Sequence, residues 1–399
     1  MLWGRGVAAG LIGLAMGLAA SAATAPSPPA GGAVRPEALR DLGKPHKVRA
    51  VYFVPADRTP TAHWREKITV LMTFVADLYR RDLREKGYKT TGLDFEFDQG
   101  RPAIHLLEGK HAAAHYSGDP KFDFMAQWDS IVPEVEAALG PVPKNLYVIF
   151  AETYDDGPTR FEWRGGVALG ARYSSDGGVG LFSAWILRDE FCATTVDRQI
   201  RLLNDATPIR GRVALGCGRM DSPRFEFIED GFGAVAHELA HAFGLPHDLR
   251  KDSEYIMGNG FRNLRRNYSI GGPQPGRAVF SPEDARVLSW SRFLAEKPDL
   301  ADHTPPTVRL EAPARLKAGA TGVPVRGRAE DDKALAAVLY WWAPMDSTVG
   351  GAALDGRRAD LDVTLPVHPV KKGRCKLVVT VIDRGGNITT ASARYEVEP

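Results

Sequence analysis

Hydrophobic residues follow two different spacings up to about residue 300. Short apolar runs, typical of strands, alternate with segments whose apolar residues recur every three or four positions, which is the spacing of amphipathic helices. We expect strands at 47–54, 93–97, 103–107, 146–151 and 180–187, and helices at 63–88, 124–139, 232–243 and 285–294. This order predicts an α/β domain over residues 47–295, in which helices cover a sheet.

The pattern changes beyond residue 306 to short strands separated by turns. The expected strands are 308–310, 323–326, 335–342, 361–365, 377–382 and 393–397. Such a series is typical of an all-β sandwich, here over residues 307–399. The polar segment 296–306, which ends in Pro305-Pro306, predicts a linker that few contacts cross. The fold class is therefore multidomain.

The N-terminus has the pattern of an export signal. Residues 7–20 form an apolar run, and the small residues that follow match a cleavage site after Ala22. The alternative is a membrane anchor, but the run is shorter than the ~20 apolar residues that a spanning helix needs. We therefore expect a signal peptide at 1–22, a flexible leader at 23–46 and a secreted protein, extracellular or periplasmic, without stable membrane insertion after cleavage.

Composition and cysteine content narrow the partners and the compartment. The chain has 51 basic and 49 acidic residues and lacks a basic block, so nucleic acid is not an expected partner. Three cysteines are present, and an exported protein can keep a disulfide. Cys192 and Cys217 lie within one predicted domain and are the expected pair, whereas Cys375 is expected to be a free thiol on a strand.

Candidate chemistry is concentrated in the stretch HELAHAFGLPHD, residues 237–248. If 232–243 is a helix with Asp230 as its N-cap, His237 and His241 lie one turn apart on the face opposite an apolar stripe. Gly244 ends such a helix because glycine tolerates the left-handed conformation. The chain then turns and brings His247 back toward the other two imidazoles. Three neutral nitrogens with one open position form an arrangement typical of catalytic zinc.

The carboxyl group of Glu238, beside His237, helps to distinguish a catalytic zinc site from two simpler interpretations: a helix that contains histidines by chance, and a structural zinc site. A helix that holds histidines by chance needs neither the glycine nor the third histidine, and a structural zinc site takes a fourth protein ligand without a neighbouring glutamate. Beside a catalytic zinc, which lowers the pKa of its bound water, Glu238 would act as the general base.

The full pattern HExxHxxGxxHD resembles the metzincin clan of zinc metallopeptidases. Met257, in Tyr255-Ile256-Met257-Gly258, fits the methionine turn beneath the metal, and Asp248 is similar to the adamalysin/reprolysin branch, while the short spacing to Met257 is closer to matrixins. Where some branches have a zinc-binding tyrosine, this chain has Asn259. The resemblance implies a zincin-like α/β (α+β) catalytic domain with a mixed sheet. The turns at 329–332 and 383–387 resemble those of bacterial immunoglobulin-like modules.

These observations together predict a secreted zinc-dependent endopeptidase. The resemblance implies a protein or peptide substrate bound as an extended strand at a sheet edge, for which 180–187 is the candidate. The alternatives are a non-proteolytic zinc amide hydrolase on another extracellular polymer, and a zinc-containing adhesion or binding protein. The C-terminal module is a candidate for binding a cell-surface or matrix ligand. A chain ended near Asp302 is expected to fold and to cleave short peptides.

Overall fold

The computed structural model describes residues 33–117, 124–156, 161–162, 168–215, 219–313 and 315–399. The predicted signal peptide lies outside these residues. The helices and strands of the N-terminal part are β1 Val48–Val54, α1 Trp64–Glu85, β2 Phe97–Asp98, β3 Arg101–Pro102, β4 Ile104–Glu108, α2 Ala113–Ser117, α3 Phe124–Leu139, η1 Val142–Lys144, β5 Leu146–Ala151, β6 Asp155–Asp156, β7 Phe161–Glu162, β8 Ala168–Ser174, β9 Gly177–Ser183, η2 Ala184–Leu187, α4 Val196–Leu203, α5 Arg224–Ala242, η3 Gly260–Asn263, α6 Leu264–Asn267 and α7 Pro282–Leu288.

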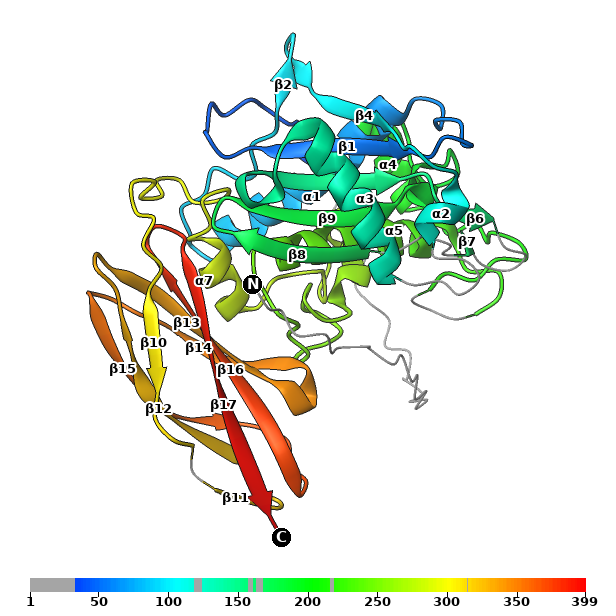
Figure 1. Cartoon of the computed structure of the whole chain (residues 1–399). Helices are drawn as coiled ribbons and strands as arrows, with labels where there is room; N and C mark the ends of the chain where they lie inside the picture. Colours follow the sequence, from blue (N-terminus) through cyan, green and yellow to red (C-terminus); the bar gives the residue numbers. More distant parts are fainter. Residues whose placement is uncertain (1–32, 118–123, 157–160, 163–167, 216–218, 314) are drawn as a thin grey trace.

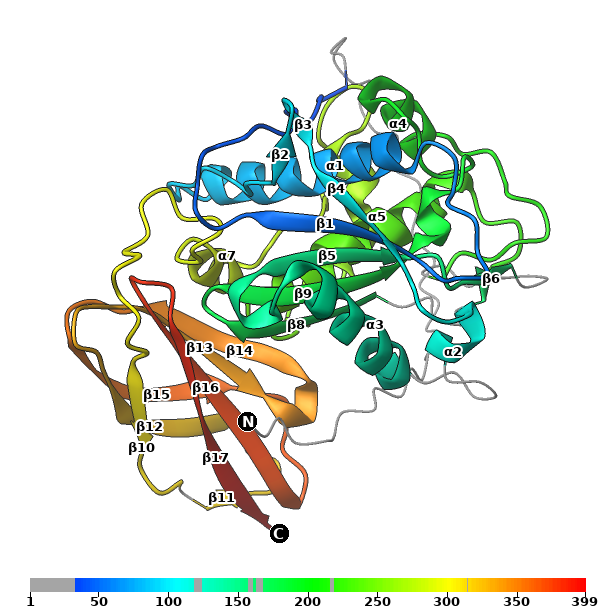
Figure 2. The ribbon, with the colours of Figure 1, turned by 45° about the horizontal axis from the view of Figure 1, so that its top comes forward.

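A five-stranded sheet in the order β4-β1-β5-β9-β8 organises the N-terminal part (Figure 1). The first four strands in this order are parallel, and β8 pairs antiparallel with β9. Side chains that alternate along β1 face opposite sides, as in any strand. Tyr52 packs in the apolar cluster with α1 and α5, whereas Phe53 packs with α3. The sheet is therefore covered by helices on both faces, and α5 lies along one of them (Figure 2).

The strand that lies at the edge of the sheet is not the one expected from the sequence. The expected strand at 180–187 was meant to be an exposed edge, but β9 lies between β5 and β8, and residues 184–187 form the short helix η2. Strand β8 is an edge of this sheet, opposite the edge strand β4, and none of the expected strands included its residues. The expected strand at 93–97 is also wrong, because only Phe97 belongs to a strand, β2.

The segment 33–46 was expected to be part of a flexible leader, and the structure corrects this. The backbone N–H groups of Leu42 and Lys44 donate to the buried carboxylate of Asp94, at 3.0 and 2.8 Å. The Lys44 ammonium donates to the carbonyl oxygens of Phe293 and Ala295, at 2.8 and 3.2 Å. Hydrogen bonds to a buried acid and to a distant loop hold this segment against the rest of the N-terminal part.

The C-terminal part contains two antiparallel-rich sheets, as expected of an all-β sandwich. Its elements are β10 Thr307–Leu310, β11 Leu316–Lys317, β12 Gly322–Glu330, β13 Leu335–Trp342, η4 Ala343–Met345, β14 Ser347–Ala353, β15 Arg358–Pro366, β16 Gly373–Asp383 and β17 Ile388–Glu398. One sheet has the order β10-β12-β15 and the other β11-β17-β16-β13-β14. An apolar cluster that includes Val325, Trp342 and Val379 fills the space between them. The expected fold class, α/β followed by all-β, is confirmed.

The two parts are packed together more closely than the polar linker indicated. Ala336, Leu339 and Ile382 of the C-terminal sheet belong to the same apolar cluster as Leu288 of α7. Helix α7 therefore packs directly against β13 and β14. The expectation that few contacts cross the linker was wrong, because strands β13 and β16 present apolar side chains on their outer face as well as toward the sandwich interior.

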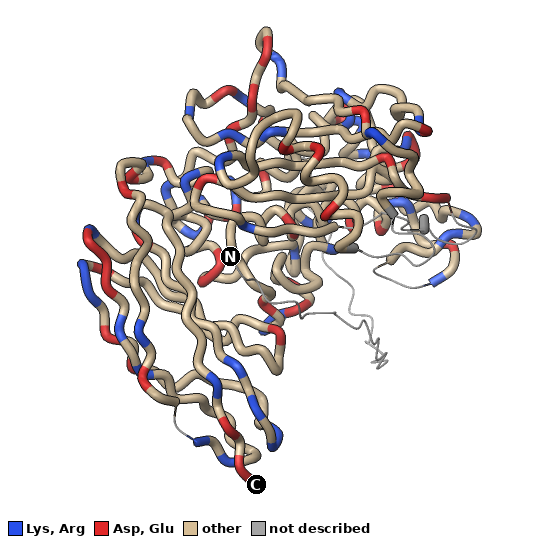
Figure 3. The backbone as a smooth tube through the Cα atoms, viewed as in Figure 1, with Lys and Arg blue, Asp and Glu red and all other residues tan. Residues whose placement is uncertain are grey.

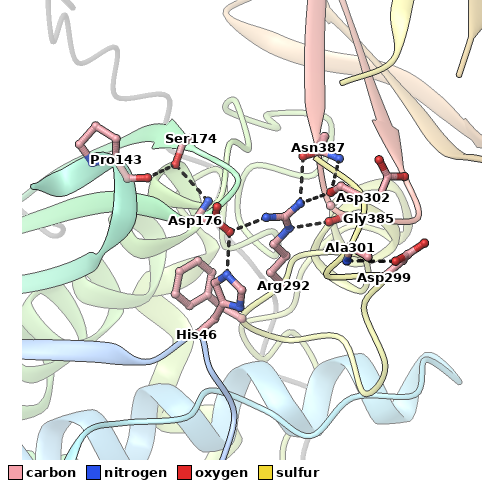
Figure 4. A network of polar contacts seen from close by, with 12 residues as sticks. His46, Pro143, Ser174, Asp176, Arg292, Asp299, Ala301, Asp302, Gly385 and Asn387 are labelled. Carbon is pink, nitrogen blue, oxygen red and sulfur yellow. Dashed lines mark hydrogen bonds and ion pairs between the residues drawn. The ribbon is translucent and has the colours of Figure 1, made fainter. Parts of the chain in front are cut away.

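Arg292 is the polar centre of this interface (Figure 4). Its side chain is fully buried, and Nε donates to the Gly385 carbonyl at 2.7 Å while Nη2 donates to Asn387 Oδ1 at 3.1 Å. Nη1 is paired with Asp176, in the turn between β8 and β9, at 2.5 Å. A single guanidinium thus connects the edge of the N-terminal sheet with the C-terminal module.

Charged side chains of both signs are interspersed over the two parts (Figure 3). The formal net charge of +2 agrees with this mixture. In the part of the chain that the structure describes, no helix has the length and apolar character needed to span a bilayer.

Candidate metal centre

Helix α5 carries the first two histidines and is longer than expected. It begins at Arg224 after Pro223, so Asp230 is not the N-cap; it lies inside the helix, buried, and pairs with Arg262 at 2.8 Å. The predicted apolar stripe is confirmed, and all four of its side chains are buried: Phe232, Val235, Leu239 and Phe243. Packing of this stripe against α1 and the sheet places the histidine face on the other side of the helix.

Gly244 ends the helix as predicted. Its φ is 97°, a left-handed conformation that favours glycine. The Gly244 N–H donates to the His241 carbonyl at 2.9 Å, and the Leu245 N–H donates to the Ala240 carbonyl at 3.1 Å. These bonds satisfy carbonyls of the last turn and reverse the chain toward His247.

The three predicted ligands are brought together. Ring nitrogens of His237, His241 and His247 lie within 4.8 Å of one another. The ring centroids of His237 and His241 are 4.9 Å apart, and those of His237 and His247 are 5.4 Å apart. A helix turn plus a reversed loop therefore produces one cluster of imidazoles, as the spacing indicated.

Each imidazole is oriented through its Nδ1 atom. His237 Nδ1 lies 2.6 Å from the Ile256 carbonyl, and His241 Nδ1 lies 2.6 Å from the Leu245 carbonyl. His247 Nδ1 lies 2.9 Å from Asp346 Oδ2. Because the partners are acceptors, the proton is on Nδ1, which leaves the lone pair of each Nε2 available.

The electrostatics keep two of these rings neutral. Burial holds the pKa of His237 well below its usual range, and the nearby His241 and His247 lower it further. Burial, with His247 second, lowers the pKa of His241 to about 4. Neutral imidazoles with protonated Nδ1 atoms are the form that binds a metal cation, so the donor set fits zinc.

The segment after the third histidine is fixed by a buried acid. Asp248 is fully buried, and its carboxylate accepts from Arg250 Nε at 2.9 Å and from Arg250 Nη2 at 2.6 Å. The Asp248 N–H donates to the Met257 carbonyl at 2.9 Å. Met257 is fully buried, next to Ile256, whose carbonyl orients His237. The turn at 255–258 thus contacts both His237, through the Ile256 carbonyl, and Asp248, through the Met257 carbonyl, while the support roles of Asp248 and Met257 stay predictions.

Glu238 lies between the histidines and the edge of the sheet. Burial raises the pKa of Glu238 to about 8, and the hydrogen bond that its carboxylate accepts from the Gly170 N–H offsets part of this rise. Gly170 belongs to β8, the edge strand. The carboxyl group is therefore positioned where the edge strand and the histidine helix meet.

Two residues near the site were not found from the sequence. Gly170 approaches α5 so closely that a Cβ atom would lie 1.8 Å from the Glu238 carbonyl oxygen. Asp346 orients His247 from the C-terminal module, 99 positions along the chain. Alternating apolar and polar residues around Gly170 would have indicated a strand there, but the sequence has no such alternation. Asp346 and His247 are too far apart along the chain for a local sequence pattern to indicate their contact.

Tyr268 and two of the three cysteines, Cys192 and Cys375, are among the described residues. Tyr268 is fully buried and donates to the Phe74 carbonyl at 3.0 Å, so it is a packing residue. Cys192 is a free buried thiol that donates to the Lys67 carbonyl at 3.4 Å, and Cys375 is free as expected. The expected disulfide between Cys192 and Cys217 is therefore not observed, because the Cys192 thiol is free and packed against the Lys67 carbonyl; Cys217 itself lies outside the described residues.

No protein-family model and no curated protein matches the sequence. Solved structures of OgpA from Akkermansia muciniphila share its fold. The wild-type protein in two crystal forms gives TM-scores of 0.58 and 0.59 at 16% identity, covering 90% of this chain and 95% and 94% of OgpA. A catalytically inactive OgpA in complex with an O-glycopeptide (glycodrosocin) substrate gives 0.55 at 14% identity, covering 90% of this chain and 95% of that one. The shared fold spans both parts of the molecule.

Proposed function

We propose that the protein is a secreted zinc-dependent endopeptidase. The observation that carries this proposal is the cluster of three imidazoles with Glu238 beside it, at the edge of a sheet. The fold shared with OgpA, which has been solved with an O-glycopeptide substrate, supports a peptide substrate. Secretion rests on the signal-peptide pattern at 1–22.

His237, His241 and His247 would hold the metal through their Nε2 atoms. A bound zinc would supply a Lewis acid that lowers the pKa of a water molecule and polarises a carbonyl group. Among the residues that the structure describes, three protein donors meet in this cluster, which fits a catalytic rather than a structural site.

Glu238 is the proposed general base. Its carboxylate would accept a proton from the water whose oxygen attacks the scissile carbonyl carbon, and would pass that proton to the amine nitrogen as the C–N bond breaks. In the metal-free site its pKa of about 8 keeps it largely protonated at neutral pH. A cation bound nearby would favour the ionised form, in which the Glu238 carboxylate can accept a proton.

Strand β8 is the proposed docking edge for the substrate. Among the described residues, β8 has a strand neighbour on one side alone. A free edge offers backbone N–H and carbonyl groups to an extended peptide. Because Gly170 of β8 contacts Glu238, a peptide that pairs along this edge passes the proposed base.

The test is digestion of a peptide panel, with and without O-linked glycans, by the chain purified from residue 23 onward. Mass spectrometry should detect cleavage that a zinc chelator abolishes and added zinc restores. Glu238→Gln should remove the cleavage, whereas Glu396→Gln, at a side chain that is 64% exposed, should not. Cleavage that survives both the chelator and Glu238→Gln would refute the proposal. Hydrolysis of another amide polymer without cleavage of any peptide would favour the non-proteolytic alternative.

A further inference from the structure

The three imidazoles differ in what orients them. His237 and His241 donate to backbone carbonyls of the N-terminal part, Ile256 and Leu245. His247 instead meets a carboxylate, Asp346 Oδ2, at 2.9 Å. Asp346 follows η4 and directly precedes β14, so it belongs to the C-terminal module. One of the three candidate ligands therefore depends on a different part of the fold.

The two residues after Asp346 bind the same loop. The Thr348 N–H donates to the His247 carbonyl at 2.8 Å, and the Leu249 N–H donates to Ser347 Oγ at 2.7 Å. Ser347 and Thr348 are fully buried. Asp346 contacts the His247 ring, and the next two residues, Ser347 and Thr348, bind the backbone of the same loop. The contact between Asp346 and His247 is therefore one of three between consecutive residues and this loop, and not an isolated ion pair.

The turn that presents Asp346 is itself held in place. Asp346 has φ 45° and ψ 43°, a left-handed conformation that aspartate, asparagine and glycine adopt more readily than other residues. Strand β14, which follows, packs on α7 so closely that a Cβ on Gly351 would lie 2.9 Å from Glu283 Cγ. Pairing with β13 and packing on α7 fix the turn relative to the histidine loop.

A carboxylate has a larger effect on an imidazole than a carbonyl has. It fixes the tautomer with the proton on Nδ1, holds the ring plane, and makes the opposite nitrogen a stronger donor to a metal. Its negative charge also favours a cation in the cluster. Loss of such an outer partner commonly weakens metal affinity by roughly 10- to 100-fold.

We propose that Asp346 is a positioning residue of the metal centre. Through it, the C-terminal module orients the His247 imidazole so that its Nε2 atom can bind the metal. The module is then a component of the site and not an appended binding domain. This inference rests on the metal site of the proposed function, but not on the reaction or substrate assigned to it.

The test compares zinc affinity in the full chain and in three variants. Asp346→Gly removes the acceptor and keeps the backbone conformation, while Asp346→Asn keeps a neutral acceptor. Asp362→Asn removes an aspartate charge from the same module at a side chain that is 75% exposed, and serves as the control. The dissociation constant is measured by competition with a chromophoric chelator. We expect it to rise by roughly 10- to 100-fold in Asp346→Gly and by less in Asp346→Asn, with no change in the control.

A second readout separates positioning from stability. In metal-free protein with ¹⁵N-labelled histidine, His247 should show the tautomer protonated on Nδ1, and Asp346→Gly should convert part of it to the other tautomer. Equal zinc affinity in the wild type and both Asp346 variants, with an unchanged His247 tautomer, would overturn the inference. A wild-type chain that binds no zinc would instead refute the proposed function. Should Asp346→Gly fail to fold, Asp346→Asn decides the question by itself.

Discussion

Gly170 of β8 lies against the backbone of Glu238, and a Cβ atom at Gly170 would stand 1.8 Å from the Glu238 carbonyl oxygen. The same glycine donates its N–H to the Glu238 carboxylate. Absence of a side chain at one position therefore brings the edge strand, the proposed general base and the histidine helix together. Such close approach of backbone to backbone is a reason for glycine within a strand.

Gly170→Ala should separate β8 from α5. The methyl group has no flexible neighbour to displace, because backbone atoms of Glu238 surround it. We expect a loss of stability of about 1–3 kcal/mol and a large loss of peptide cleavage. Urea unfolding and digestion of a short peptide measure the two effects.

Gly350→Ala is the matched control for this substitution. Its added Cβ would meet the end of the Leu365 side chain at 3.2 Å, which can give way. If Gly170→Ala is as stable and as active as Gly350→Ala, the contact between β8 and α5 does not constrain the site.

Glu238→Gln should preserve zinc binding and abolish most of the cleavage. The amide keeps the shape of the side chain and an acceptor for the Gly170 N–H, but it cannot accept the proton of the attacking water. A decrease of the order of 10²–10⁴ in kcat is expected, with zinc content measured by elemental analysis unchanged. Near-native turnover would show that another group is the base, and loss of zinc would show that Glu238 supports the metal.

Glu229 should make the stability of the metal-free protein depend on pH. Burial in α5 raises the pKa of Glu229 to about 8 from its ordinary value of 4.5, and the bond from the Arg265 N–H offsets part of the rise. Between these values the folded protein holds a proton that the unfolded chain releases. The free energy of unfolding therefore falls as pH rises through this window, by up to roughly 1.4 kcal/mol per pH unit.

Glu229→Gln should remove this contribution. Glutamine keeps an acceptor for the Arg265 N–H and does not ionise. Urea unfolding at about pH 5 and about pH 7.5 should show a smaller decrease in the variant than in the wild type. Equal decreases in the two proteins would mean that the Glu229 carboxyl is not held protonated by the fold.

The sequence predicted those features that depend on neighbours along the chain. Helix 124–139 and strands 146–151 and 335–342 have the predicted bounds, because continuous apolar periodicity determines them. His237 and His241 were located because helix geometry relates their spacing to a common face, and Gly244 and His247 because a glycine ends the helix and lets the chain reverse. In each case the residues that form the pattern are close to one another in the sequence.

Strands β8 and β14 were missed for a shared reason. Residues 168–174 and 347–353 contain glycines and polar residues without apolar alternation. They become strands because β9 and β13 supply the backbone hydrogen bonds, with registers such as Leu169 to Leu181. Both strands border the site, so the two elements that adjoin Glu238 and His247 were the ones that local patterns could not indicate.

Removal of the C-terminal module should inactivate the protein, contrary to the expectation from the polar linker. A chain ended at Asp302 would lose two acceptors of Arg292, the Gly385 carbonyl and Asn387 Oδ1. A buried guanidinium without its partners is costly, and the apolar surface of α7 that β13 covers would face water. His247 would also lose Asp346. We expect poor solubility, and zinc affinity lowered at least as much as in Asp346→Gly. Soluble yield, zinc content per chain and cleavage of a short peptide test this. A soluble truncated chain that cleaves the peptide at the full-length rate would show that the module is separable, since neither Arg292 nor Asp346 would then be needed to hold the site.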